Sequence, residues 1–294
     1  MKKQFKTVIS ASRRTDIPAF YMEWFMRQIV KGTFEVVNPY NRHISRVKAA
    51  AADVDTIVFW SKNFGPFLKG RYGEKLIDLG YHLFFNFTIN SEERLLEPDV
   101  PTLTERLDQI YTLCKRFGAE RVQWRFDPVC FYIEKNGNEK NNMNDFDFIA
   151  SKVSNSGINR CITSFVDLYP KVIKREKTIS GFSFVDPPLD KKIKILLHME
   201  KLLASKSIEL YTCCEKELVE AIPPESSIKN SSCIPNRLLA ELSAGRISLR
   251  KDSGQRLKEG CGCLVSTDIG SYNLHPCFHN CIFCYANPSE KKVS

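Results

Sequence analysis

Three cysteines near the C-terminus have the spacing of a metal-binding loop. Cys277, Cys281 and Cys284 form the pattern C-x3-C-x2-C, with Phe283 directly before the third thiol. Three thiolates from one tight loop can each bind one iron of a 4Fe–4S cluster, which leaves the fourth iron open to an exogenous ligand. A structural zinc ion needs four protein ligands in a closed tetrahedron, and a histidine of the same segment could supply the fourth. We therefore expect a metal site here, with iron–sulfur favoured over zinc.

Further thiols could build a second metal site. They are Cys213, Cys233, Cys261 and Cys263. Four protein thiolates without an open position fit an auxiliary 4Fe–4S cluster or a structural zinc ion, and Gly262 permits the irregular backbone that a C-x-C pair needs. Cys214 adjoins Cys213, and the spacing alone does not decide which of the two faces inward. Simple packing is expected of three others, Cys114, Cys130 and Cys161.

The elements that must position these thiols alternate between strands and helices. Short runs rich in Val, Ile, Phe and Thr predict strands at 7–12, 34–38, 56–60, 83–88, 121–126, 161–166, 208–212 and 264–267. Several are continuously hydrophobic, as parallel strands covered on both faces are. Repeated strand–helix units predict an α/β fold with a parallel, TIM-like (β/α) barrel, complete or partial. A doubly wound open sheet is the alternative, weakened because no glycine-rich phosphate loop follows the first strand.

Capping residues place helices between these strands. Asp16 predicts the start of the first helix and Gly32 its end. The Thr102–Glu105 capping box predicts the start of another helix, and the apolar pattern over 191–204 predicts a third. The polar run 136–144 is expected to be a surface loop.

Polar residues gather where the expected strands end, which in a (β/α) barrel is the rim that carries chemistry. Those expected to be catalytic are Arg13, Arg14, Asp16, Lys62, Asn63, Arg125 and Asp127, and those expected to bind a cofactor are Ser12, Asn86 and Asp167. Arg125 is flanked by apolar residues, so its charge needs a partner or an anionic ligand. We expect the barrel domain to span residues 1–260 and a Cys-rich, cluster-binding segment, residues 261–294, to pack on its rim.

The C-x3-C-x2-C motif resembles the signature of the radical S-adenosylmethionine (SAM) superfamily. In that superfamily the amino and carboxylate groups of SAM chelate the open iron, and the aromatic residue before the third cysteine lies against the adenine. The resemblance implies cluster ligation by Cys277, Cys281 and Cys284, adenine contact by Phe283, and a full or partial (β/α) barrel. The superfamily's loop follows the first strand, whereas this one is C-terminal. A closed barrel would return it to the same rim, because first and last strands are then neighbours.

Almost the whole chain resembles a bacterial and archaeal family of uncharacterised proteins, whose cysteine-rich C-terminus is similar to the radical SAM motif. The segments that carry the resemblance are 12–18, 58–63, 124–128, 212–215, 261–263, 266–270 and 281–286. It favours Cys213 over Cys214 as a ligand, and it implies no particular reaction.

These observations lead to the hypothesis of a radical SAM-like enzyme, in which a reduced C-terminal 4Fe–4S cluster cleaves SAM to start radical chemistry on an unknown substrate. The cofactors would be SAM and one 4Fe–4S cluster, or two. The expected partners are a small-molecule or nucleotide-like anionic substrate and a reducing electron donor such as flavodoxin or ferredoxin. A zinc- or cluster-containing protein that binds nucleic acid without radical catalysis is the alternative, consistent with the formal charge of +9.

The apolar segments and the cysteines also indicate which cellular compartment to expect. No stretch reaches the roughly 20 mostly apolar residues of a membrane span. The short apolar run after the first lysines ends in Arg13 and Arg14, which is not typical of a signal peptide. We expect a cytoplasmic protein, in which disulfides are rare and crowded thiols point to metal.

Overall fold

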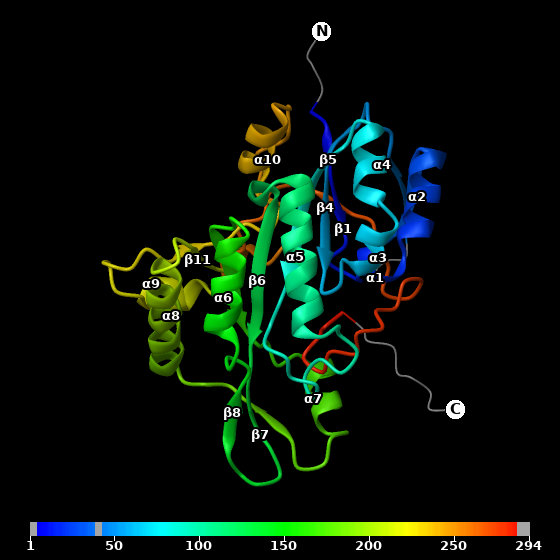
Figure 1. Cartoon of the computed structure of the whole chain (residues 1–294). Helices are drawn as coiled ribbons and strands as arrows, with labels where there is room; N and C mark the ends of the chain where they lie inside the picture. Colours follow the sequence, from blue (N-terminus) through cyan, green and yellow to red (C-terminus); the bar gives the residue numbers. More distant parts are fainter. Residues whose placement is uncertain (1–4, 39–42, 287–294) are drawn as a thin grey trace.

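The computed structural model describes residues 5–38 and 43–286. Its centre is an eight-stranded parallel sheet with the order β12-β11-β9-β6-β5-β4-β1-β13 (Figure 1). The strands are β1 (Thr7–Ala11), β4 (Val54–Ser61), β5 (His82–Thr88), β6 (Val122–Val129), β9 (Arg160–Phe165), β11 (Glu209–Thr212), β12 (Lys229–Asn230) and β13 (Thr267–Asp268). From β1 to β12 each strand lies beside the next one of the sheet in chain order, and β13 pairs with the other side of β1.

The expected α/β fold with a parallel sheet is confirmed, but closure into a complete barrel is not observed. Within residues 5–38 and 43–286, β12 and β13 are the two edges and do not pair with each other. Both edge strands are only two residues long, so neither offers a ladder of hydrogen bonds to its counterpart.

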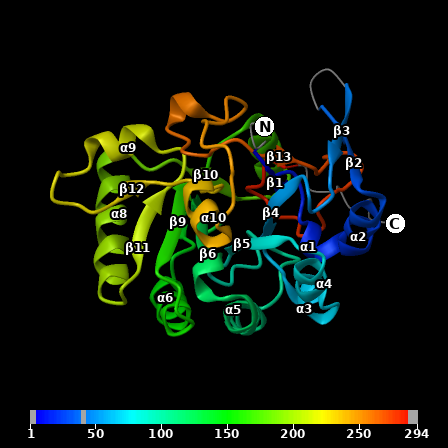
Figure 2. The ribbon, with the colours of Figure 1, turned by 90° about the horizontal axis from the view of Figure 1, so that it is seen from above.

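Helices cover the outer face of the sheet (Figure 2). They are α1 (Ile17–Phe20), α2 (Met22–Lys31), α3 (Gly65–Lys69), α4 (Tyr72–Asp78), α5 (Leu103–Phe117), α6 (Phe146–Asn155), α8 (Leu189–Ala204) and α9 (Lys216–Ala221). Alternate strand residues such as Phe59, Phe85 and Trp124 pack with them in the main hydrophobic core. Burial of these large side chains on the helix side is the main stabilising contribution to the sheet.

The inner face of the sheet carries a second core. Val58, Phe84 and Ile162, which alternate with the outer residues, pack against α10 (Asn236–Ser243) and against Cys233, Cys261 and Cys263. Successive side chains of a strand point to opposite faces of the sheet. The polar strand residues that stand two positions from Val58, Phe84 or Ile162 therefore also lie on the inner face. The inner face is therefore where thiols and polar strand residues meet.

One expected strand does not belong to the main sheet. The run at 34–38 forms β2 (Thr33–Val37), which pairs antiparallel with β3 (Ile44–Lys48) in a hairpin. Phe34 and Val36 are buried while Glu35 is exposed, which is the alternation of a half-solvated antiparallel strand rather than of a doubly covered one. Consequently the end of this strand is not part of the rim.

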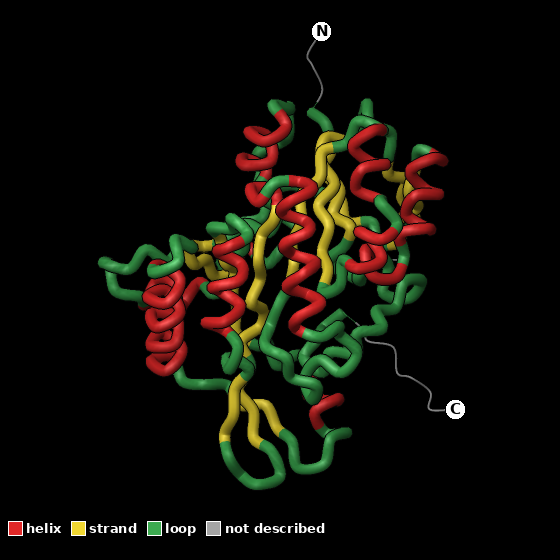
Figure 3. Tube along the Cα trace, viewed as in Figure 1, coloured by secondary structure: helices red, strands yellow, loops and turns green. Residues whose placement is uncertain are grey.

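A small antiparallel sheet extends from the carboxyl end of β6 (Figure 3). It has the order β10-β7-β8 and consists of β7 (Phe131–Ile133), β8 (Glu139–Asn141) and β10 (Ser183–Val185), with α7 (Pro170–Glu176) between β9 and β10. The expectation of a loop over 136–144 is therefore wrong for 139–141. Three polar residues carry no apolar signal, and only pairing with β7 makes them a strand.

The predicted capping residues are confirmed, but two helices, α1 and α2, lie between Asp16 and Gly32 where one was expected, and α8 begins at Leu189, two residues before its predicted start. The Asp16 carboxylate accepts a hydrogen bond from the Ala19 amide at 2.9 Å, and Gly32 ends α2 in the left-handed region with φ 76°. Thr102 and Glu105 form the reciprocal capping box of α5. Two short 3-10 helices, Ala119–Arg121 and Leu257–Glu259, complete the elements of the described chain. Each helix that the structure describes is too short or too polar to cross a lipid bilayer.

Candidate metal centres

The cysteine loop, residues 277–284, lies at the carboxyl ends of the first strands. β13 pairs with β1 through Ile9 and Thr267, so the chain that follows β13 continues beside the end of β1. The Ile282 amide donates to the Leu96 carbonyl at 3.0 Å, which joins the loop to the segment that follows β5. The expected return of the loop to the first strand is thus achieved by pairing of β13 with β1, without barrel closure.

Asp16 joins three parts of this rim. Its carboxylate accepts hydrogen bonds from the Ser61 hydroxyl at 2.8 Å and the Lys62 amide at 2.9 Å, both at the end of β4. Nε2 of His279, in the cysteine loop, lies 2.8 Å from its Oδ2. Both side chains are buried. Asp16 therefore acts in this structure as a positioning residue that ties the loop to β1 and β4.

The thiols of the cysteine loop are sheltered and close enough to affect one another. Cys281 is buried, and Cys277 and Cys284 are half-buried. Burial raises the pKa of Cys277 to about 12 and that of Cys281 well above its ordinary value, and the charge of Cys284 adds to both rises. Ionising all three thiols here needs positive charge nearby.

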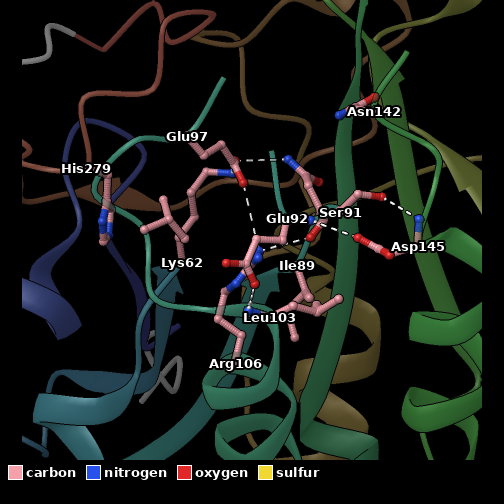
Figure 4. A network of polar contacts seen from close by, with 12 residues as sticks. Lys62, Ile89, Ser91, Glu92, Glu97, Leu103, Arg106, Asn142, Asp145 and His279 are labelled. Atoms are coloured by element: carbon pink, nitrogen blue, oxygen red, sulfur yellow. Dashed lines mark hydrogen bonds and ion pairs between the residues drawn. The ribbon is translucent and has the colours of Figure 1, made fainter. Parts of the chain in front are cut away.

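Lys62 supplies a positive charge beside the loop. Its ammonium forms an ion pair with buried Glu97 and lies 5.3 Å from the centre of the Phe283 ring. Burial alone would lower the pKa of Lys62, but the charges of Glu97 and Cys281 outweigh it and the pKa is raised. Figure 4 shows Lys62 and Arg106 converging on Glu97. Lys62 thus remains an ammonium next to the Cys281 thiol.

The backbone of the cysteine loop is held from its other side. The Arg175 guanidinium, on α7, donates to the carbonyls of Cys281 at 2.8 Å and Ile282 at 2.7 Å, and also to the carbonyl of Cys284. Ile282 and Phe283 are buried in a hydrophobic cluster with side chains of the small antiparallel sheet. The loop is therefore fixed by hydrogen bonds and packing that do not use its thiols.

Five other thiols gather on the inner face, and we call them the inner thiol group: Cys213, Cys214, Cys233, Cys261 and Cys263. The Sγ atoms of Cys213 and Cys233 are 3.5 Å apart, and those of Cys213 and Cys214 are 3.9 Å apart. Cys233, Cys261 and Cys263 are buried in one hydrophobic cluster, and Cys213 and Cys214 pack against it.

Two arginines point at the inner thiol group. Nη1 of Arg125 donates to Sγ of buried Cys233 at 2.7 Å. Burial alone would lower the pKa of Arg13, but the charges of Cys263 and Asp268 raise it. Both guanidinium groups also lie over the Trp60 ring, 5.5 Å from its centre for Arg13 and 5.3 Å for Arg125. The neighbouring thiols of Cys233 and Cys261 and the charge of Arg13 hold the pKa of Cys263 well below its ordinary value.

Other candidate residues also lie near this group. Asp127 forms an ion pair with Arg125, so the buried arginine has the partner that the sequence required. Burial alone would raise the pKa of Asp127, but the Arg125 charge lowers it. The Asn86 amide donates to the Cys233 carbonyl at 3.0 Å. Asn86, Arg125 and Asp127 are thus brought together on the inner face, as strand alternation requires.

Four candidates make contacts elsewhere. Ser12 donates to the Asp268 carboxylate of β13 at 2.7 Å, and Arg14 donates to the Gly270 carbonyl at 3.1 Å. Asn63 accepts hydrogen bonds from the Gly65 amide at 2.9 Å and the Gln109 amide at 3.1 Å, so it organises the start of α3. Asp167 is exposed and forms an ion pair with Arg256. Their assignments as catalytic or cofactor-binding residues stay predictions.

Whether a metal ion or a cluster can bind at these sites depends on how the ligand side chains are arranged. In residues 5–38 and 43–286, no group of three or more His, Cys, Asp or Glu side chains surrounds one point as the ligands of a single metal ion do. A 4Fe–4S cluster does not require that arrangement, because each thiolate binds a different iron. The three sheltered thiols of the cysteine loop and the nearby ammonium are therefore compatible with a cluster, and cluster binding stays a prediction. The sulfurs of the inner thiol group do not surround one point as the ligands of a closed single-ion site do, so its expected role as a second metal site also stays a prediction.

Sequence reasoning missed several residues of these sites. Glu97 and Arg175 carry no motif, and only the fold brings them to the cysteine loop. Trp60 packs against the inner core, and the guanidinium groups of Arg13 and Arg125 both lie over its ring. Cys214 could have been included from its adjacency to Cys213 alone.

A family model described as "Domain of unknown function (DUF1848)" matches residues 8–286, and the chain belongs to this family. The expected membership in a family of unknown function is thereby confirmed. No curated protein matches the chain.

Proposed function

We propose that this member of the DUF1848 family is a radical SAM-like enzyme built on an open, partial (β/α) barrel. The cysteine loop would bind one 4Fe–4S cluster through Cys277, Cys281 and Cys284, with SAM at the open iron. One observation carries the proposal: β13 delivers a loop with three sheltered thiols to the carboxyl ends of β1 and β4, beside the Lys62 ammonium.

The position of the loop supports this function. Active sites in parallel (β/α) sheets lie at the carboxyl ends of the strands. Radical SAM proteins place their cluster loop after the first strand, and here the partner of that strand is β13. The loop that follows β13 can therefore occupy the position that a loop after β1 would occupy.

The chain's own residues would prepare the site. The cluster, when bound and reduced, supplies the electron that cleaves SAM into methionine and a 5′-deoxyadenosyl radical. Lys62 balances negative charge at Cys281, which would otherwise be costly in a buried site. Ile282 and Phe283 exclude water on the side of the small sheet, and Asp16 fixes the loop through His279. Preorganisation of this kind is the protein's usual contribution to cofactor chemistry.

Substrate and electron donor are proposed by class. The excess of 43 Lys and Arg over 34 Asp and Glu favours an anionic small molecule or a nucleotide-like substrate. A low-potential donor such as flavodoxin or ferredoxin would reduce the cluster, and we expect the reaction in the cytoplasm. The nucleic-acid alternative has weaker support, because Arg13 and Arg125 face thiols and Trp60 inside the fold.

The test is anaerobic reconstitution of the full chain with iron and sulfide. We expect about four iron atoms per chain at the cysteine loop, a reduced-state electron paramagnetic resonance signal that changes on addition of SAM, and formation of 5′-deoxyadenosine with dithionite. Reaction without reductant is the control. An iron-loaded protein whose signal ignores SAM and which forms no 5′-deoxyadenosine above that control would overturn the proposal.

A further inference from the structure

We propose that α7 and the residues beside it form a docking surface for an acidic electron carrier of the flavodoxin type. This inference rests on the proposed function, because it names the partner that would reduce a cluster in the cysteine loop. It is carried by the contact of α7 with that loop, by the charge on the exposed side of α7, and by the apolar groups that border this side.

The first observation is the position of α7. Figure 1 shows this helix next to the C-terminal segment, which is drawn in red. Arg175 of α7 donates to the carbonyls of Cys281 at 2.8 Å and Ile282 at 2.7 Å, and also to the carbonyl of Cys284. One side chain of α7 thus contacts the backbone of two of the three cysteines. A partner on the exposed side of α7 would be separated from the cysteine loop by this one helix.

The exposed side of α7 is positively charged. It carries exposed lysines at every third position, Lys171, Lys174 and Lys177. Residues three apart on a helix are surface neighbours, so the three charges follow one another along one side. Nζ of Lys171 lies 5.7 Å from the centre of the Tyr272 ring, in the segment between β13 and the cysteine loop. The charges therefore lie at the border between α7 and the chain that leads into the loop.

The neighbouring carboxylates have other partners. Glu176 of α7 accepts a hydrogen bond from the Phe184 amide of the small antiparallel sheet at 2.9 Å. Asp167, which precedes α7, forms an ion pair with Arg256 at 2.7 Å. The lysine side of α7 therefore keeps a positive charge, and such a surface attracts an acidic protein and speeds its association.

Apolar side chains are exposed beside the lysines. Ile173 of α7 is 36% exposed, and Tyr285, directly after the cysteine loop, is 46% exposed. The Tyr285 ring lies 5.9 Å from that of Tyr169, the residue before α7, so it belongs to the same surface. An apolar and aromatic centre with a charged border is typical of protein interfaces and suits the exposed edge of a flavin. Electron-transfer complexes are small and weak, so a surface built around one helix is sufficient.

The experiment compares two reductants in the anaerobically reconstituted full chain. Reduced flavodoxin tests the docking surface, whereas excess dithionite, which needs no protein contact, measures the cleavage of SAM independently of docking. In Lys171→Glu/Lys174→Glu/Lys177→Glu, the flavodoxin-driven formation of 5′-deoxyadenosine at low salt should fall at least about ten-fold, because the surface then repels the carrier. The rate with excess dithionite should be unaltered. Lys171→Gln/Lys174→Gln/Lys177→Gln, which only removes the charges, should show a smaller decrease and decides if the first variant does not fold.

Two controls separate docking from other effects of charge. Lys69→Glu/Lys115→Glu/Lys201→Glu changes the net charge equally, at exposed lysines in the last turns of α3, α5 and α8, and should retain the flavodoxin-driven rate. At a salt concentration of about 1 M, where charges are screened beyond about 3 Å, the α7 variant and the wild-type protein should react at similar rates.

Three results would overturn the inference and leave the proposed function intact. The first is an equal flavodoxin-driven rate in the α7 variant and the wild-type protein, and the second is an equal decrease in the α7 variant and the control variant. The third is a wild-type protein that is active with dithionite but not with flavodoxin. Weaker binding of single-stranded RNA by the α7 variant, at an unaltered flavodoxin-driven rate, would assign the surface to nucleic acid instead. Absence of 5′-deoxyadenosine from the wild-type protein with dithionite is a different result, because it would contradict the proposed function and this inference with it.

Discussion

The cysteine loop and the inner thiol group use the same side chain in two different ways. The loop takes three thiols from one short segment and sets them beside a lysine ammonium, with no thiol–thiol hydrogen bond described among them. The inner thiol group takes five thiols from three segments and places them in mutual contact, with two arginines facing them. The first arrangement suits a cluster with an open iron, whereas the second packs thiols and arginines into the inner core.

The two regions also differ in what supports them. Hydrogen bonds from Arg175, and the contact between His279 and the Asp16 carboxylate, hold the cysteine loop without using its thiols. At the inner thiol group, backbone hydrogen bonds and the Asn236 side chain, which donates to the Val265 carbonyl at 2.9 Å, join the two ends of the sheet. Removal of the loop's thiols should therefore affect activity more than stability, whereas removal of a buried inner thiol should destabilise the fold.

The largest expected effect comes from removing the cysteine loop's thiols. In Cys277→Ser/Cys281→Ser/Cys284→Ser, reductive cleavage of SAM should fall at least about a thousand-fold, because the cluster supplies the chemistry. The midpoint of urea unfolding should stay close to that of the wild-type protein. 5′-Deoxyadenosine assays and urea titration measure these two quantities. An unaltered rate of cleavage in this variant would contradict cluster binding by the loop.

The inner thiol group should dominate stability. Cys233→Ala leaves a cavity and leaves the buried Arg125 without its thiol acceptor, so we expect the free energy of unfolding to fall by about 3 kcal/mol. Cys161→Ala, a buried cysteine of the helix-side core, is the control, with an expected loss of about 1–2 kcal/mol. Urea titration measures both. Equal losses for the two variants would contradict a stabilising contact between Arg125 and Cys233.

Replacement of Lys62 tests whether its positive charge offsets the negative charge of the thiols in the cysteine loop. Lys62→Met leaves Glu97 buried with Arg106 as its remaining cation, so we expect a loss of about 3 kcal/mol and a ten- to about hundred-fold slower cleavage of SAM. Adding Glu97→Gln should restore stability but not the rate. Lys48→Met, which breaks an exposed ion pair with Asp53, should change the free energy of unfolding by less than about 0.5 kcal/mol. Unaltered cleavage in Lys62→Met would exclude a role in catalysis.

The smallest effect should come from the capping box at the start of α5. Thr102→Ala removes the capping box of α5, with an expected loss of about 1 kcal/mol and unchanged metal content. The Thr102 hydroxyl and amide lower the pKa of Glu105, so this contact stabilises the fold at neutral pH and is lost as the pH falls through the range where Glu105 is protonated. Urea titrations at neutral and acidic pH should show a smaller difference between Thr102→Ala and the wild-type protein in acid. A constant difference would contradict the role of Glu105.

Local signals predicted the elements better than their assembly. The caps at Asp16, Gly32 and Thr102 depend on a few adjacent residues and are confirmed. The short strands of the small sheet and the hairpin position of the 34–38 run depend on partners distant in sequence, and they were missed or misplaced. The sequence left open whether the barrel is complete or partial for the same reason, because hydrophobic runs show that strands exist but not which edges pair, and the sheet is open.

The sequence by itself determined the spacing of the thiols in the cysteine loop, and with it the prediction of a cluster, because the thiols and the aromatic residue lie within eight positions of one another. It also determined the parallel α/β class through continuous hydrophobic runs. Only the tertiary structure placed Lys62, Glu97 and Arg175 around that loop, and only it assembled the inner thiol group at the edges of an open sheet. The physical reason is that short-range spacing fixes local geometry, whereas contacts between distant segments depend on how the whole chain packs.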